Sequence, residues 1–505
     1  MEDHPAVTAT TTSSSVKRAS LTRRQRAWRL ICEAARLVLK VMRPVCTCGP
    51  LAWILTYVFT LGNILTGQPP ALQSHRDLIS MTVLVSTSFH GISVFVTYAL
   101  SLRNFHRLDG SRWTFAQLVG RFIKKTWAAY SLAHILVVGG TYVIVSVAHA
   151  FSATFKLHLY LACAWNSLYR ASVDEASRSI YQRETLEGVE GGHVNDAPYW
   201  RRYVQAVGRS INFAVIAMLA ASLVHVCSAL DMLNSSFASL KFSVASVVLK
   251  SIVLSITKRI ALQHGGTHLR KIYVLTAVPT VLINTQVRLV LLQNVKSGSS
   301  VRSFLELGLL EPLLRVTKVW HLQRTIDQVK RNSQSRVSSV ASLRARVHRI
   351  SAILPLPHSL TRHQTQTARL SKLVRPATIL DSRQSLLHFH AAESHADMCS
   401  EYIAIICSTS IFFFLQRHSR FGWHEAGDSG DVAGWEETLL AGSWQVGIEV
   451  VVDFVCCAFE LANGIPLHDT ESLGGFLTAV FTCTALVSVS ISTVLCAHDA
   501  ASTST

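Results

Sequence analysis

Long apolar stretches dominate the sequence and restrict what the chain can fold into. Each stretch is 15 to 24 residues long. A helix rises about 1.5 Å per residue, so stretches of this length match the ~30 Å of hydrocarbon in a bilayer. They fall at 51–66, 78–101, 128–151, 155–169, 211–232, 241–257, 272–293, 399–416, 445–464 and 474–497. The pattern predicts an all-α fold, a polytopic transmembrane helical bundle with about nine or ten membrane segments.

Composition and motifs argue against a soluble enzyme. Only 15% of the residues are charged, against about 25% in soluble domains. The sequence contains no Walker loop, no His-Glu-x-x-His and no Gly-x-Ser-x-Gly. It indicates no catalytic residue, metal ligand or cofactor, and whether the chain is an enzyme stays open.

The basic residues alternate along the chain in a way that predicts topology. The net charge is +18, and all 48 Lys and Arg precede residue 421. In a membrane protein, clustered Lys and Arg mark cytoplasmic connections. This reading is favoured over a nucleic-acid partner, so the expected partner is the lipid bilayer and the N-terminus is expected in the cytoplasm. The basic connections are 1–50, 102–127, 170–210 and 258–271, and the cation-poor ones are 67–77, 152–156 and 233–241.

Residues 21–43 form a basic amphipathic segment. Trp28, Ile31 and Ala35 recur at three- and four-residue steps on one side, while Arg29 and Arg36 lie on the other. Such a helix lies flat on a membrane, with its basic face toward anionic headgroups. A mitochondrial transit peptide and a soluble packing helix are the alternatives.

We expect four regions. Residues 1–50 hold a disordered tail and the amphipathic helix, 51–293 a first membrane group, 294–398 a basic cytosolic linker, and 399–498 a C-terminal membrane group. The linker has sixteen Lys and Arg against six acids and is a candidate binding region for a cytosolic protein.

The number of predicted membrane crossings conflicts with the charge of the region that follows residue 293. Seven crossings from a cytoplasmic N-terminus would leave residue 294 on the outside, although the region that follows is basic. One block is therefore expected not to cross. Block 272–293 is predicted to be a broken or re-entrant helix, with 155–169 as the second candidate. The apolar run of block 272–293 is interrupted by Pro279, Asn284, Gln286 and Arg288.

An acidic stripe in block 445–464 is the main candidate site. At 100° per residue, Glu449, Asp453 and Glu460 lie within about 40° of one another. A carboxylate facing lipid at the membrane centre costs roughly 2.5–3.5 kcal/mol. The stripe should therefore face inward, with Lys250 and Arg288 as candidate intramembrane partners. It fits an ion or proton pathway, a buried ion pair joining two parts of the bundle, or an interfacial helix that does not span.

Histidines are weaker candidates. His90, His134 and His225 could join a proton relay or simply pack through hydrogen bonds. His388, His390 and His395 form a loose cluster with Glu393 and Asp397 but match no metal-ligand spacing. The sequence favours a secondary transporter or channel-like protein. The alternative is a membrane scaffold or receptor whose basic cytosolic region binds lipid or protein partners.

Overall fold

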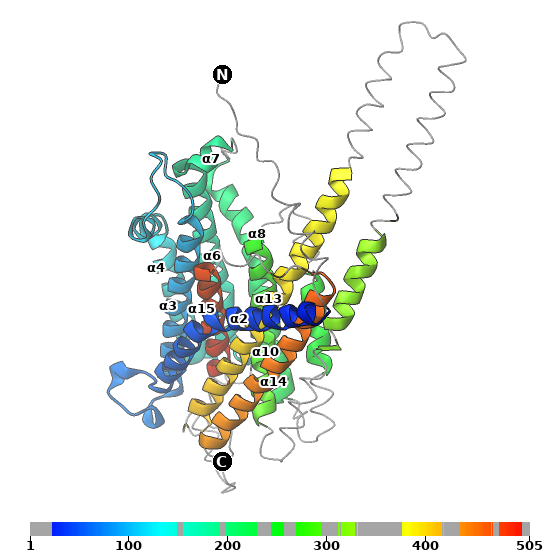
Figure 1. The fold of residues 1–505 in the computed structure, drawn as a ribbon. Coiled ribbons are helices and arrows are strands. Elements are labelled where there is room, and N and C mark those ends of the chain that lie inside the picture. Colours follow the sequence, from blue (N-terminus) through cyan, green and yellow to red (C-terminus); the bar gives the residue numbers. More distant parts are fainter. Residues whose placement is uncertain are drawn as a thin grey trace, which may run out of the picture.

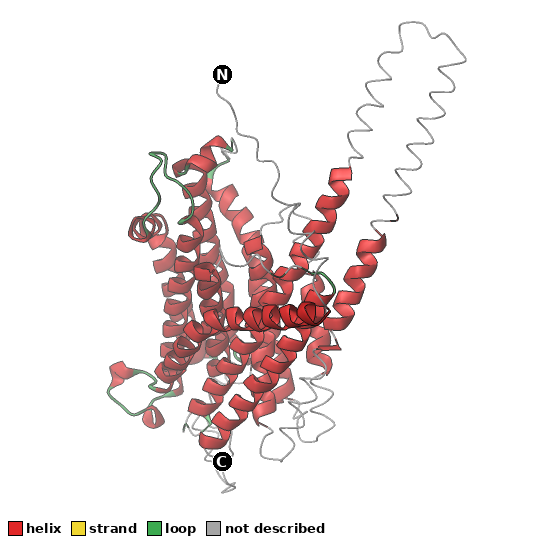
Figure 2. Ribbon diagram, in the orientation of Figure 1, coloured by secondary structure: helices red, strands yellow, loops and turns green. Residues whose placement is uncertain are grey.

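The fold is all-helical. The computed structural model describes residues 23–148, 155–191, 197–229, 244–256, 269–293, 312–313, 315–328, 331, 376–416, 418, 435–465, 467 and 474–496. Within these residues there is no β-strand, and the only bridges are His106–Arg112 and Arg107–Thr185. Figure 2 accordingly shows helices joined by loops. The predicted all-α bundle is confirmed.

The long helices run side by side (Figure 1). Helices α3, α4, α6 and α8 pack against one another in one part of the bundle, and α10, α13 and α14 in another, while α15 contacts α2, α3, α10 and α13. Their bounds are α2 Arg23–Thr60, α3 His75–Leu102, α4 Phe115–Val147, α6 Leu157–Glu184, α7 Leu186–Glu190, α8 Tyr199–Ala229, α10 Leu269–Gln293, α13 Pro376–Leu415, α14 Trp435–Ala462 and α15 Gly474–Cys496, with 3-10 helices η1 Ile64–Thr66 and η2 Pro70–Leu72.

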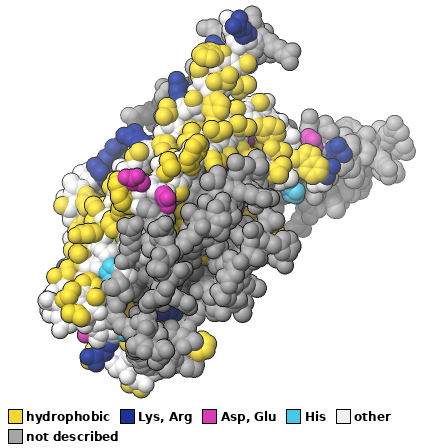
Figure 3. Space-filling view, turned by 90° about the horizontal axis from the view of Figure 1, so that it is seen from below, with side chains coloured by type: hydrophobic (Ala, Val, Ile, Leu, Met, Phe, Trp, Pro, Cys, Tyr) yellow, Lys and Arg dark blue, Asp and Glu magenta, His cyan; other side chains and the backbone are white. Residues whose placement is uncertain are grey.

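Six described helices are long and apolar enough to cross a membrane. Their outer surfaces are strongly apolar: Ile135 is 68% exposed and Ile54 is 59% exposed. Figure 3 shows hydrophobic side chains as a broad band over the described surface. Lipid is the solvent in which such a surface is stable. The segments are Ala27–Thr66, His75–Leu102, Phe115–Val147, Tyr273–Val290, Leu386–Leu415 and Gly475–Val494.

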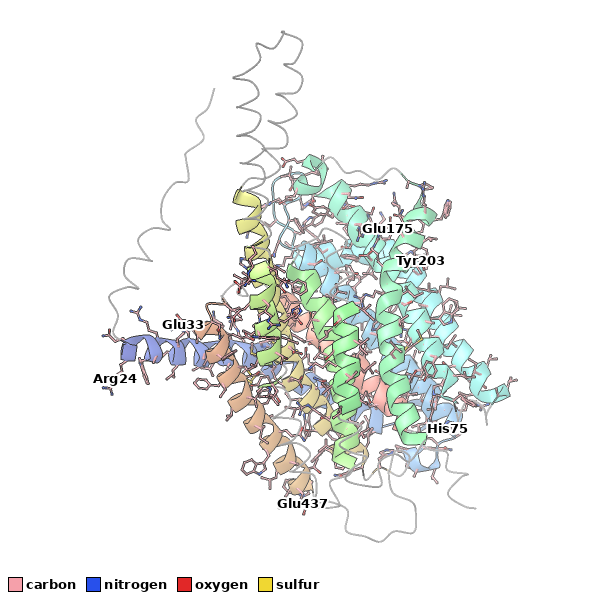
Figure 4. The ribbon with its side chains drawn as sticks, turned by 90° about the vertical axis from the view of Figure 1, so that its right-hand side faces the viewer. Arg24, Glu33, His75, Glu175, Tyr203 and Glu437 are labelled. Atoms are coloured by element: carbon pink, nitrogen blue, oxygen red, sulfur yellow. The ribbon has the colours of Figure 1, made fainter. Side chains whose placement is uncertain are left out.

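The amphipathic segment is the first part of a longer helix. α2 continues past Arg43 into the first apolar block, with Pro44 and Pro50 inside it, and it changes direction along its length (Figure 1). Proline removes a backbone hydrogen bond and bends helices. In Figure 4 the first part of α2, marked by Arg24 and Glu33, extends sideways at the opposite end of α14 from Glu437.

Between α10 and α13 in the sequence lies a further helix that hydropathy does not reveal. Residues 315–328 are helical. The Gln323 side-chain amide donates to Asn463 Oδ1 at 2.9 Å, and Arg315 contacts Asp453, so this helix runs parallel to α14. It brings the chain back toward the end at which α13 begins (Figure 1). The expected break in 272–293 is wrong, because α10 is continuous through Pro279.

Two segments expected to be connections are also helical. α6 extends to Glu184 and α8 starts at Tyr199, so much of 170–210 belongs to the bundle. Likewise, α13 begins at Pro376, within the expected linker 294–398. Figure 4 places Glu175 of α6 and Tyr203 of α8 in neighbouring helices, far from His75.

The connection between α3 and α4 is hydrogen-bonded to α7. The Leu186 amide donates to the His106 carbonyl at 3.0 Å, and His106 Nδ1 lies 2.8 Å from Glu187 Oε1. The hydrogen bond with the His106 side chain lowers the pKa of Glu187 below its ordinary value. The connection is therefore held in place at one end of the bundle.

Epitope tags would test this topology. Gly67, Gly110 and Gly464 lie in turns with open space around them, so each should accept a short insertion. We expect tags at Gly110 and Gly464 to be accessible from one side of the membrane and a tag at Gly67 from the other. Antibody binding to intact and permeabilised cells measures this. Tags at Gly110 and Gly464 on opposite sides would contradict the return through residues 315–328.

Gly442 should be required for the packing of α14 on α13. A Cβ atom at this position would lie 2.9 Å from the Thr409 side chain, whereas one at Gly447 would meet nothing within 4 Å. We expect Gly442→Ala to cost about 1–3 kcal/mol through overpacking and Gly447→Ala to be neutral or stabilising by up to about 1 kcal/mol. Thermal unfolding of the two variants in detergent compares them, and equal melting temperatures would contradict the packing.

Candidate functional site

α14 has a polar inner face and an apolar outer face. Val451 and Val455 on the outer face are 62% and 55% exposed. The buried residues are instead polar or small: Thr438, Gly442, Gln445, Glu449, Asp453, Cys456, Cys457 and Glu460. The three carboxylates of the predicted stripe thus lie inside the bundle.

A second acidic stripe on α13 faces the same interior. Glu393, Asp397 and Glu401 follow at intervals of four residues, so they share one face of the helix. They are 8%, 4% and 3% exposed. Buried carboxylates are stable only with cationic or hydrogen-bonding partners, and basic side chains from three other helical segments supply them.

Arg288 of α10 lies between α13 and α14 and contacts a carboxylate on each. Its Nη2 atom lies 2.9 Å from Glu401 Oε2 and 3.2 Å from Glu449 Oε2. Asn284, one helical turn earlier on α10, donates a short hydrogen bond to Glu401. The three helices therefore meet at one guanidinium.

The contacts continue along α13 through two lysines. Lys250, from the helix Val244–Ile256, lies 2.6 Å from Glu401 and 3.1 Å from Asp397. Lys318 then lies 3.4 Å from Asp397 and 3.5 Å from Glu393. Acidic and basic groups thus alternate without a break. We call this set the charge ladder: Glu449, Arg288, Glu401, Lys250, Asp397, Lys318 and Glu393.

The remaining stripe carboxylates lie beside the ladder. Arg315 Nη1 is 2.7 Å from Asp453 Oδ1, and these side chains are only 5% and 0% exposed. Glu460 accepts from Ser394 Oγ at 3.1 Å and lies 3.6 Å from His390 Nε2.

The two ends of the ladder differ in exposure. At the outer end, the Lys318 and Glu393 side chains are 35% and 10% exposed. At the inner end, Arg288 and Glu449 are 5% and 3% exposed. Eight residues of α13 separate Glu393 from Glu401, which is about 12 Å along the helix. The ladder therefore has one partly exposed end and one buried end, and Lys250 between them is 14% exposed.

Sequence reasoning located some of these groups and missed others. Arg288 contacts the predicted stripe at Glu449, but Lys250 pairs with α13 instead of α14. Glu401, Arg315 and Lys318 were not identified. The four-residue repeat from Glu393 to Glu401 was the available signal for the α13 stripe, whereas no signal marked residues 315–328 as buried.

The histidines divide into several environments. His134 Nε2 lies 3.0 Å from Ser88 Oγ, and its Nδ1 lies 3.0 Å from the Tyr130 carbonyl, as expected for a packing residue. His395 Nδ1 lies 3.7 Å from Cys399 Sγ. The side chain of His225 lies outside the described residues. Among the residues that the structure describes, no three His, Cys, Asp or Glu side chains converge as a metal site would require.

Comparison with known proteins adds no relative. No protein-family model matches the chain, and neither a curated protein nor a solved structure matches it. The class of protein to which this chain belongs is therefore inferred from the structure alone. Its apolar helices fit a multi-pass membrane protein, and its polar interior contains the charge ladder.

The pair between Arg315 and Asp453 should contribute strongly to stability. Arg315→Leu leaves a fully buried carboxylate without its guanidinium partner, which costs about 3–5 kcal/mol. We expect a clear fall in melting temperature in detergent and substantial recovery in the double variant Arg315→Leu/Asp453→Leu.

Arg121→Gln is the control for this prediction. Arg121 is 51% exposed beside Glu184, which Lys125 also contacts at 3.0 Å, and a surface pair contributes only about 0–1 kcal/mol. Equal effects of Arg315→Leu and Arg121→Gln would show that the Arg315 pair is not buried.

Proposed function

We propose that this protein is a secondary transporter whose charge ladder takes up and releases protons. The observation that supports this most is the continuous alternation of acids and bases from partly exposed Lys318 to buried Glu449. Ionisable groups inside a membrane protein are costly and commonly mark ion or proton pathways. We further propose that the basic connections and the N-terminus face the cytoplasm.

The chemistry of the ladder favours protons over metal cations. Basic side chains lie between successive carboxylates, so a metal ion would meet positive charge at each step. A proton instead binds one carboxylate oxygen and neutralises it. The adjacent base then retains only its other carboxylate neighbour.

Arg288 provides a way to couple protonation to helix movement. It contacts Glu401 of α13 and Glu449 of α14 at the same time. Protonation of Glu449 weakens the contact with α14, leaving there the longer hydrogen bond from Arg288 Nη1 to Gln445 Oε1 (3.4 Å). Glu401 of α13 still holds the guanidinium. The attraction between α10 and α14 therefore depends on the proton, as alternating access requires of a moving interface.

Flux measurements test this function. We expect the protein in pH-dye-loaded vesicles to move protons when a gradient is imposed. Glu449→Gln should lower the rate at least about tenfold, because it removes the titrating group while Arg288 keeps its contact with Glu401. Glu436→Gln, an exposed position on the same helix, should leave the rate unchanged.

The outcomes separate transport from a purely structural role. The proposal would be refuted if vesicles with the wild-type protein showed no proton flux with any of a panel of added solutes. It would also be refuted if the Glu449→Gln variant moved protons as fast as the wild type. Melting temperatures of all variants show whether a loss of flux reflects misfolding.

A membrane scaffold is the second candidate, supported by α2. Trp28 and Leu39 are 66% and 71% exposed on its first part, and Arg29 and Arg36 are exposed beside them. Exposed apolar and basic side chains on one helix favour binding to an anionic lipid surface. The bulk of the basic segment 294–398, proposed to bind a cytosolic protein, lies outside the described residues.

A further inference from the structure

A cavity separate from the charge ladder lies between α3, α6, α10 and α15. The volume of this cavity is about 100 Å³, and Ser210 of α8 also lines it. On α10 its lining residues are Val278 and Leu282, whereas Arg288 faces the ladder. At 100° per residue, Leu282 and Arg288 point about 120° apart. The cavity and the ladder therefore lie on different faces of α10.

Polarity changes along the part of α6 that lines the cavity. Leu159, Ala162 and Cys163 come first, followed by Asn166, Ser167 and Arg170. From Leu159 to Arg170 the helix rises about 16 Å. One end of the cavity is therefore apolar, and the other offers a cation and hydrogen-bonding groups.

The neighbouring helices repeat this gradient. On α3, Val83 lies toward the apolar end and His90 toward the polar end. On α15, which runs in the opposite direction to α3 (Figure 1), Thr484 lies toward the polar end and Val494 toward the apolar end. Three helices thus place polar groups at one end and mostly apolar groups at the other. The exception is Ser490 of α15, whose hydroxyl donates to the Leu486 carbonyl.

The polar end contains an amide and a cation. Asn166 and Arg170 both line the cavity. Arg170 lies close to His90 and Tyr98, which places its charge at this end of the cavity. The guanidinium of Arg170 and the side-chain NH₂ of Asn166 are both hydrogen-bond donors, so together they can bind a carboxylate.

We propose that this cavity binds a single-chain carboxylate amphiphile, such as a medium-chain fatty acid. The carboxylate would accept hydrogen bonds from Arg170 and Asn166, and the chain would lie along Leu159, Leu282 and Val494. Binding pockets of this kind are mostly apolar with a few polar groups that fix the orientation. The proposal does not depend on proton transport by the ladder.

Equilibrium binding of radiolabelled decanoate to the full chain in nanodiscs tests the site. Saturable binding above empty nanodiscs is expected for the wild type. Arg170→Gln should weaken it about tenfold or more, because a charge-assisted hydrogen bond is lost. Arg178→Gln is the matched control, since Arg178 lies two turns further along α6, is 48% exposed and pairs with Asp174.

A pair of further variants and a competition measurement distinguish loss of the site from misfolding. Ala162→Phe fills the cavity and should abolish binding, whereas Ala164→Phe, at an exposed position of the same helix, should not. Unlabelled decanoate should displace the label and decanol should not. Absence of saturable binding, equal binding in the Arg170→Gln and Arg178→Gln variants, or equal displacement by decanol would overturn the proposal.

Discussion

The structure depends on keeping buried charge away from lipid. On α14, Asp453 is fully buried while Val451 is 62% exposed, the reverse of a helix on the surface of a soluble protein. In water this arrangement would leave apolar side chains exposed and charged groups buried. In a bilayer both faces are satisfied, because hydrocarbon solvates the outside and ion pairs hold the inside. The identity of the surrounding solvent therefore determines how α14 packs.

Local sequence was sufficient to predict most of the long helices and the inward direction of α14. Apolar length predicts helices in a bilayer because every backbone group must be satisfied within the segment. The spacing of Glu449, Asp453 and Glu460 also determines a common face without any knowledge of neighbouring helices. These predictions follow from helical geometry and the cost of exposing charge to lipid.

Local sequence patterns could not predict which helices, distant in the sequence, pair with one another. The segment containing Arg315 and Lys318 looked like a polar linker, because hydropathy measures a side chain's average preference and not its partner. Those side chains are buried only because α13 and α14 present carboxylates to them. Similarly, the sequence suggested a break at Pro279, but the helix continues there. Membrane helices tolerate proline when neighbouring groups satisfy the freed backbone.

Buried ion pairs hold helices together, but this does not explain the form of the ladder. Replacing such pairs with well-packed apolar residues is often neutral or stabilising, so adhesion alone does not require seven linked charged residues. An adhesive network has no need of an accessible end, whereas a proton path must begin where protons can enter. One end of the ladder is partly exposed, at Lys318 (35%), and the other is buried, at Arg288 (5%) and Glu449 (3%). The proposed proton pathway would use this exposed end, which adhesion alone does not need.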